Sequence, residues 1–466
     1  MGDSVTGFWL REALGGKPLE TEALAGDARA EVAILGGGFT GLWTALRLKA
    51  LEPALDVAVI EKNFCGSGAS GRNGGFCMTW ASKIHTLVKL CGAQEGLRLY
   101  RATEEGVGAI GAFCREHGID AGFRQDGWLW TASNPAQLDA WQPCLDQLER
   151  LGANPFQVLD GDEAARWAGA PVVLAGVYEP TVASLQPARL ALGLRRVALE
   201  RGVRIYEQSP VTRIERGPRP RLETAQGSLT ADKLVLALNA WAAELPEFRL
   251  NLLPLVADLL ITEPAPKALE GSGLEGGLAI SDSRSLVHYY RSTPDGRIAF
   301  GKASGAFFYG GRVGERAEGA SPYHAKMAQS FERFVGGRGD FAIAESWRGP
   351  VTRTQNGLPV FGRLKRHPNI VYGHGYCGNG VGPSYTGAKF LASLALDRND
   401  EWATSPLAQG PLCDGFPPEP FRYIGANLVR DAVARIESAQ DTGRRPNPID
   451  RALARFAPEG LVRTEN

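Results

Sequence analysis

The sequence predicts an α/β protein with two domains and a helical C-terminal tail, and three observations support this prediction. A short apolar run at 31–35 is followed by a glycine-rich turn, a helical pattern and a second apolar run at 56–62, which together form a βαβ unit. A stretch at 250–345 is rich in alternating, strand-like segments. Helical patterns return at 421–439 and 448–456. We therefore expect a discontinuous Rossmann-like domain, a second α+β domain built on an antiparallel sheet, and a helical tail.

The remaining elements follow from local patterns of the chain. The run 56–62 is apolar on both faces, as a central parallel strand is. Amphipathic spacing predicts helices at about 38–51, 81–118, 134–168 and 188–202; strand and hairpin patterns cover 203–217 and 222–240; and 369–396 reads as strand, glycine loop and helix. The expected division is a lead-in at 1–29, the Rossmann-like domain at 30–80, 155–245 and 346–400, the second domain at 81–154 and 246–345, and the tail at 401–466.

Composition restricts the class of protein. Lys plus Arg and Asp plus Glu are both 51, so the net charge is zero, which argues against a nucleic-acid partner. The seven cysteines form no CxxC pair and fit a reducing cytosol better than a disulfide framework or zinc site. No leader pattern opens the chain, and no apolar run approaches 18 residues. We expect a cytoplasmic protein without a membrane span or a metal.

The glycine-rich turn predicts a dinucleotide site. Gly36, Gly38 and Gly41 form G-x-G-x-x-G, in which the three glycines allow a sharp turn, close approach to a pyrophosphate, and tight packing of helix on strand. Glu61 ends the second strand, where a carboxylate accepts hydrogen bonds from a ribose diol. The alternative is an ordinary tight turn between a strand and a helix.

The next segment separates two classes of dinucleotide. An NAD-binding domain would continue into an ordinary helix, whereas "CGSGASGRNGGF" at 65–76 holds five glycines, an Arg and an Asn. Such a segment can run extended beside a larger ligand. The alternative is a flexible surface loop.

These segments, in this order, resemble the D-amino-acid-oxidase-like flavoprotein superfamily, in its branch of sarcosine, glycine and gamma-glutamylputrescine oxidases. The resemblance covers about residues 30 to 400 and rests on "GGGFTGL", "VIEK", "GASGRNGG", "GVRIYEQSPVTRI", "LVLALNAWA", "WRGPVTRTQNGLPVFG" and "GHGYCGNGVG". It implies FAD as cofactor. It assigns to FAD binding Gly36, Gly38 and Gly41 at the pyrophosphate, Glu61 at the ribose, Ser70, Arg72 and Asn73 along the flavin and pyrophosphate path, Val211 near the adenine, and Gly378, Asn379, Gly380 and Val381 at the flavin edge.

The chain departs from that branch at three positions. The segment "RGPVTRTQNG" lacks the Cys that tethers flavin in sarcosine oxidases, and Cys377 lies in a different loop, so we predict non-covalent FAD. Ala299 stands where those oxidases carry a Lys that helps oxygen react, with Lys302 three residues on. Several relatives have His in place of Asn379.

The segment "LVHYYRST" is expected to cover the substrate. Alternation places Tyr290 and His288 on one face and Tyr289 and Arg291 on the other, and we expect Tyr290 and His288 to face the substrate. Arg348 and Arg353 are candidates for binding an anionic group. Each has a structural alternative, a satisfied sheet residue or a surface arginine.

The resemblance predicts an FAD-dependent amine oxidoreductase. Its substrate would be a small primary or secondary amine that carries an anionic group, such as an amino acid, an N-methyl amino acid or an aminophosphonate. Hydride transfer to flavin N5 gives an imine that water hydrolyses to an aldehyde or keto acid, and O2 reoxidises the flavin with release of H2O2. The alternatives are an amine dehydrogenase with a quinone or carrier-protein acceptor, a flavoprotein that serves binding, assembly or RNA modification, and an NAD-dependent dehydrogenase.

Overall fold

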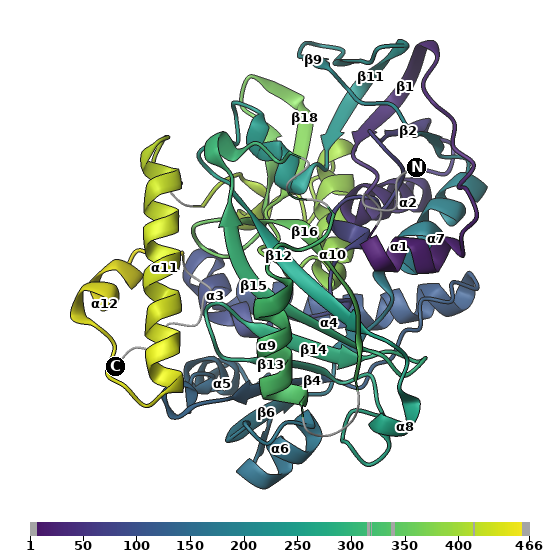
Figure 1. The fold of residues 1–466 in the computed structure, drawn as a ribbon. Helices are drawn as coiled ribbons and strands as arrows, with labels where there is room; N and C mark the ends of the chain where they lie inside the picture. Colours follow the sequence, from purple (N-terminus) through teal and green to yellow (C-terminus); the bar gives the residue numbers. More distant parts are fainter. Residues whose placement is uncertain (1–6, 315–316, 318, 337–340, 413–414, 459–466) are drawn as a thin grey trace.

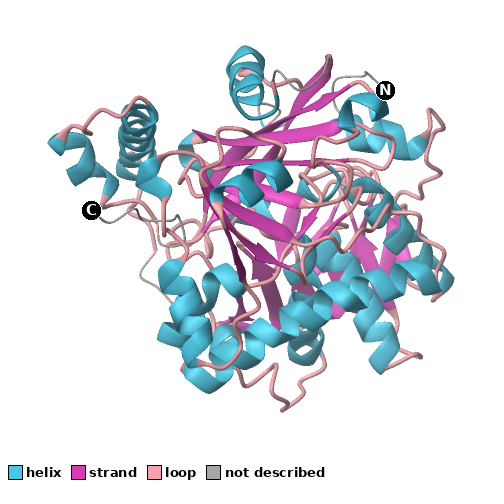
Figure 2. Ribbon diagram, turned by 90° about the horizontal axis from the view of Figure 1, so that it is seen from below, coloured by secondary structure: helices cyan, strands magenta, loops and turns pink. Residues whose placement is uncertain are grey.

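The computed structural model describes residues 7–314, 317, 319–336, 341–412 and 415–458 of the 466-residue chain. Two eight-stranded sheets dominate it, one in the upper right of Figure 1 and one at its centre, and two C-terminal helices stand at one side. Seen from below in Figure 2, helices surround the strands. The predicted fold class is confirmed.

The first sheet has the order β17-β18-β11-β1-β2-β8, and β9 and β10 extend from β11. Strands β18, β11, β1, β2 and β8 are mutually parallel. All four residues of β2 are buried, as expected for a strand covered on both faces. The strands are β1 (Gly26–Leu35), β2 (Val57–Ile60), β8 (Arg204–Tyr206), β9 (Arg213–Glu215), β10 (Arg221–Glu223), β11 (Gly227–Leu236), β17 (Val360–Leu364) and β18 (His367–His374).

The second sheet has the order β16-β12-β15-β14-β13-β4-β6-β5. Its pairs are antiparallel except for β13 with β4. The strands are β4 (Trp128–Ala132), β5 (Gln157–Leu159), β6 (Ala175–Glu179), β12 (Leu253–Thr262), β13 (Ala279–Asp282), β14 (His288–Ser292), β15 (Ile298–Phe307) and β16 (Ile343–Arg353). A short separate pair joins β3 (Phe76–Cys77) to β7 (Ala183–Ser184).

The sheets divide the chain differently from the expected boundaries at two places. β5 and β6 lie within 155–245, but β5 pairs with β6, and β6 pairs with β4 of the second sheet. β16 begins before 346 and pairs along its length with β12. These pairings join segments far apart in the chain, so local patterns do not contain them.

The helices close both layers. Helices α2, α7 and α10 pack together beside the first sheet, and α4 packs on α10. The expected helical stretch 134–168 holds two helices with β5 between them. The helices are α1 (Gly7–Leu14), α2 (Phe39–Leu51), α3 (Ile84–Cys91), α4 (Ala93–Glu116), α5 (Gln142–Arg150), α6 (Gly161–Ala168), α7 (Pro187–Glu200), α8 (Pro266–Leu269), α9 (His324–Val335), α10 (Val381–Ala395), α11 (Phe421–Asp441) and α12 (Pro448–Ala454).

Ionic contacts attach the tail helix α11 to the second sheet. Near its C-terminal end, Asp441 accepts hydrogen bonds from Arg284, Arg333 and Asn134. One turn earlier, Glu437 accepts a hydrogen bond of 3.0 Å from the backbone N–H of Leu286. Among the described residues, no helix combines the length and apolar character that crossing a bilayer requires.

Candidate functional site

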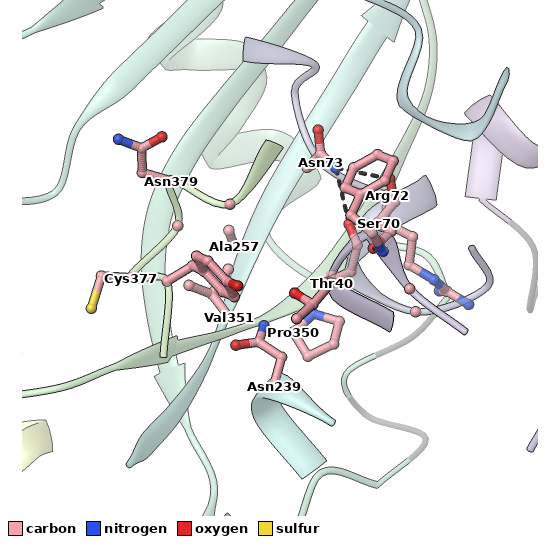
Figure 3. A pocket seen from close by; sticks show the side chains of 18 of the residues that line it. Thr40, Ser70, Arg72, Asn73, Asn239, Ala257, Pro350, Val351, Cys377 and Asn379 are labelled. Atoms are coloured by element: carbon pink, nitrogen blue, oxygen red, sulfur yellow. Dashed lines mark hydrogen bonds between the residues drawn. The ribbon is translucent and has the colours of Figure 1, made fainter. Parts of the chain in front are cut away.

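A cavity of about 810 Å³ lies where the first sheet meets the second. Its lining joins the turn after β1, the end of β2, the segment 66–74, the turn after β11, strand β12, the end of β16 and the loop before α10. Figure 3 shows Asn379 and Cys377 on one side of it, Ser70, Arg72 and Asn73 on the other, and Ala257 and Val351 between them. The carboxyl ends of the parallel strands therefore open into this cavity, as in other open α/β sheets that bind ligands.

The glycine turn leaves no room for side chains. A Cβ on Gly41 would lie 1.9 Å from the carbonyl oxygen of Gly36, and one on Gly38 would lie 2.9 Å from Ser70 Oγ. Gly36 has φ of +113°. Helix α2 begins at Phe39, so its N-terminus and the positive end of its dipole lie at the cavity. This bare backbone beside a helix N-terminus fits a pyrophosphate.

Glu61 is held at the end of β2. Its carboxylate accepts hydrogen bonds from the backbone N–H groups of Gly37, at 2.8 Å, and Asn63, at 3.1 Å. Burial raises the pKa of this carboxyl above its usual value, although both hydrogen bonds oppose the change. The group lines the cavity beside the glycine turn, where the sequence placed the ribose contact.

The segment after β2 is a compact turn beside the cavity. Ser70 Oγ accepts a hydrogen bond of 2.9 Å from Phe39 N–H at the start of α2. The amide of Asn73 donates to Ser70 O at 2.9 Å and accepts from Gly75 N–H at 2.8 Å. Arg72 is buried, and its Nε donates to Ser67 O at 2.8 Å. Ser70, Arg72 and Asn73 all line the cavity, and these contacts order the turn.

The turn after β11 supplies residues that the sequence-based candidates missed. Asn239 has φ of +44°, and its Oδ1 accepts hydrogen bonds from Thr352 Oγ1 at 2.9 Å and Gly375 N–H at 3.2 Å. Trp241 carries Lys62 4.6 Å above its ring, and its buried indole nitrogen has no partner among the described residues. Both line the cavity, as Val211 does. The signal available in the sequence was an Asn in the turn that follows a buried strand.

The loop before α10 presents a helix N-terminus to the cavity. Gly378 has φ of +87°, and Gly380 precedes the first residue of the helix, Val381. The amide of Asn379 donates to Thr79 O at 3.1 Å, while its buried Oδ1 has no partner among the described residues. All four predicted residues of this loop line the cavity.

Tyr289, rather than Tyr290 or His288, lines the cavity from β14. A Cβ on Gly74 would lie 2.7 Å from its ring, and one on Gly301 would lie 2.0 Å from it, so both glycines make room for this tyrosine. Tyr290 is buried on the other face, where its hydroxyl donates to Ala168 O at 2.7 Å. His288 contacts Asp282 Oδ2 at 2.8 Å and Lys302 Nζ at 2.5 Å. The alternation was predicted, but the face expected to meet the substrate is the one that packs away from the cavity.

The two candidate arginines have different surroundings. Arg348 is buried and pairs with Asp258 at 3.1 Å, and it does not line the cavity. Arg353 lines the cavity, and no hydrogen bond or ion pair joins it to another described residue. Burial lowers its pKa. Lys83 lines the same cavity, and burial, with the nearby Arg353, lowers its pKa to about 8.

Strand β15 and the loop before α10 hold the residues at which the sequence departs from sarcosine oxidases. Ala299 is buried with Leu259 and Tyr289, while Lys302 contacts His288. Cys377 lines the cavity, and its thiol donates to Gly375 O at 3.1 Å. Non-covalent binding of the cofactor stays a prediction.

Comparison with known proteins places these features in a family. The family model described as "FAD dependent oxidoreductase" (DAO) matches residues 31–394. Gamma-glutamylputrescine oxidoreductase of Escherichia coli (strain K12) is 30% identical over 382 residues, which cover 81% of this chain and 86% of that protein. Among solved structures, glycine oxidase from Geobacillus kaustophilus has a TM-score of 0.68 at 21% identity, covering 83% of this chain and 100% of that one. L-proline dehydrogenase from P. horikoshii has a TM-score of 0.67 at 19% identity, covering 82% and 98%.

Proposed function

The chain belongs to the DAO family of FAD-dependent oxidoreductases, and on that premise we propose that it oxidises a small amine carrying an anionic group, at the carbon next to the nitrogen. When bound, FAD supplies a hydride acceptor. The oxidised substrate is an imine, which water hydrolyses to an aldehyde or a keto acid. Amino acids, N-methyl amino acids and aminophosphonates meet this description.

The observation that carries the proposal is Arg353. Its side chain is half-buried and lines the cavity without a carboxylate partner among the described residues, although a cation withdrawn from solvent is normally paired. Lys83 adds a second basic group to the same cavity. An anionic substrate would supply the missing counter-charge, and a planar guanidinium binds a carboxylate or phosphonate through two parallel hydrogen bonds.

The other groups would hold the cofactor and shield the reaction. The α2 N-terminus and the glycine turn would bind the pyrophosphate, and Glu61 the ribose. The α10 N-terminus would stabilise negative charge on the reduced flavin. Ala257, Leu259 and Tyr289 form a largely apolar wall opposite, which would exclude water from the reacting carbon.

The test is anaerobic reduction of the yellow holoenzyme by a panel of amines, followed by absorbance near 450 nm. The panel contains glycine, sarcosine, D-amino acids, glutamylated polyamine, and aminoalkyl phosphonates and sulfonates, each with an uncharged analogue. We expect an anionic amine to bleach the flavin, and Arg353→Met to raise the concentration needed at least tenfold, with partial rescue in Arg353→Lys. Bleaching by none of these amines, or equal bleaching by uncharged analogues, would contradict the proposal.

A dehydrogenase with a quinone or carrier-protein acceptor is the second candidate. It is favoured because the side chain of Lys302 contacts His288, whereas Ala299 stands where sarcosine oxidases carry Lys. Admitting air to the bleached enzyme separates the two. Recolouring within seconds, with stoichiometric H2O2, identifies an oxidase, and recolouring only when an artificial quinone is added identifies a dehydrogenase.

A further inference from the structure

A second cavity, of about 700 Å³, lies between the second sheet and the C-terminal helices, and we call it the tail chamber. Its inner wall comes from β12, β15 and the end of β16. Its outer wall comes from one face of α11, which includes Arg422, Gly425, Leu428 and Val429, and from residues 453 and 455–458. The family model ends at residue 394, so this outer wall is built by chain beyond the family match.

The tail chamber adjoins the cofactor cavity. Four residues line both: Leu255, Ser285, Ala303 and Arg353. Arg353 therefore stands at the junction. A molecule whose anionic group binds Arg353 would extend in one direction toward the cofactor and in the other into the tail chamber.

The side chains that line the tail chamber indicate which kind of ligand it can bind. Most lining side chains are apolar, and every charged one is basic: Lys89, Arg353, Arg422, Arg430 and Arg455. Among the described lining residues there is no carboxylate, so nothing would compensate a cationic arm such as that of a polyamine. Arg422 pairs with Glu419 and Arg430 with Asp431, whereas Arg353 has no carboxylate partner among the described residues. An apolar arm attached to an anion at Arg353 therefore matches the chamber.

We propose that the tail chamber binds the apolar arm of the substrate, an amine whose anionic group lies at Arg353 and whose alkyl or aryl substituent reaches toward α11. This inference rests on the proposed function for the amine, but binding of the arm is separable from turnover. Helix α11 would then determine which lengths of the substrate's apolar arm the enzyme binds.

The test titrates the holoenzyme with unreactive carboxylates and follows the flavin absorbance spectrum. The probes are acetate, butyrate, hexanoate and octanoate. Each added methylene should tighten binding by up to about fourfold, as expected for burial of a CH2 group in an apolar site. Octanol, which has the chain without the charge, should bind at least tenfold more weakly than octanoate.

Two matched pairs of variants locate the arm. Gly425 lines the chamber, and a Cβ there meets nothing within 4 Å, so Gly425→Trp should fill the space and abolish the gain with chain length while acetate binds normally. Ile424, on the same helix but outside the lining, gives the control Ile424→Trp. Leu428 and Ile424 are 51% and 52% exposed, so Leu428→Asp and Ile424→Asp compare a repelling charge inside and outside the chamber.

The outcomes separate this inference from the proposed function. Equal affinity along the series, or a chain-length gain that survives in Gly425→Trp and Leu428→Asp, would overturn the tail chamber as a substrate site. If octanol bound as tightly as octanoate, the assignment of Arg353 as the binding site for the anionic group would be wrong. If affinity rises clearly with chain length but no amine reduces the flavin, the tail chamber is supported and the proposed function is refuted. If amines reduce the flavin but affinity does not rise with chain length, the proposed function is supported and the tail chamber is refuted.

Discussion

Lys83 is a cavity residue whose charge changes near the pH of a typical assay. Burial, with the nearby Arg353, lowers its pKa to about 8, so it loses its proton far below the usual range for lysine. Because it shares the cavity with Arg353, its charge adds to the attraction for an anionic ligand. The local sequence around Lys83 carries no sign of this, since burial and the arginine both come from distant parts of the chain.

We therefore expect carboxylate binding to depend on Lys83 and pH. A bound anion favours the protonated amine, so affinity should be constant well below pH 8 and fall about tenfold as the pH rises from 7 to 9.5. Lys83→Met should bind weakly at pH 7 and show no such fall. The measurement is acetate titration at constant ionic strength. Lys62 lines the same cavity, and the control variant Lys62→Met should still lose affinity as the pH rises. An unchanged pH profile in Lys83→Met would contradict the assignment.

At the scale of single elements, strand β14 shows what periodicity predicts and what it leaves open. Alternation correctly separated Tyr290 and His288 from Tyr289. It did not say which set meets the cavity, because that depends on which face of the finished sheet packs against Phe300 and Phe334. Gly301, opposite Tyr289 on β15, is the sequence feature that accompanies the bulky ring on the cavity face.

The turn into α2 brings Gly41 close to the carbonyl group of Gly36, and this contact leads to a direct prediction. Gly41→Ala should give protein that purifies with little or no FAD, because its Cβ would lie 1.9 Å from the Gly36 carbonyl oxygen and displace the turn. Flavin content per chain is the measurement, with far-UV circular dichroism to check folding. Gly108→Ala is the control, since Gly108 is also helical and a Cβ there meets nothing within 4 Å. Full flavin content in folded Gly41→Ala would refute this reading of the turn.

At the scale of the whole molecule, a partly buried charge network joins the tail to the second sheet. Although burial opposes it, hydrogen bonds from Arg284 and Arg333 hold the pKa of Asp441 at about 2. Glu437 behaves oppositely: burial raises its pKa to about 7. We therefore expect the docking of α11, and with it the outer wall of the tail chamber, to depend on pH near neutrality.

The sign of that dependence follows from the direction of the shift. Because the pKa of Glu437 is higher in the folded chain, its contribution to stability is greatest below the unfolded value of 4.5 and is lost as the pH rises through about 7. The thermal midpoint should fall by a few degrees between pH 5 and 8. Glu437→Gln should flatten this fall, while Glu401→Gln, at an exposed site, should not. Differential scanning fluorimetry checks it, and an equal fall in Glu437→Gln would exclude Glu437 as the cause.

The sequence by itself determined the cofactor and the family, and most of the residues that it assigned to the dinucleotide line one cavity of the structure. Glycine turns, a carboxylate at the end of a strand and a loop before a helix are local features of the chain. Their ligand-binding chemistry can therefore be predicted from the sequence alone. Only the tertiary structure decided which arginine has no carboxylate partner among the described residues, which face of β14 meets the cavity, and what the tail covers. Arg348 is paired because β16 lies beside Asp258 of β12, and the tail chamber exists because α11 packs against β15. Those contacts join residues distant in sequence, and no local pattern contains them.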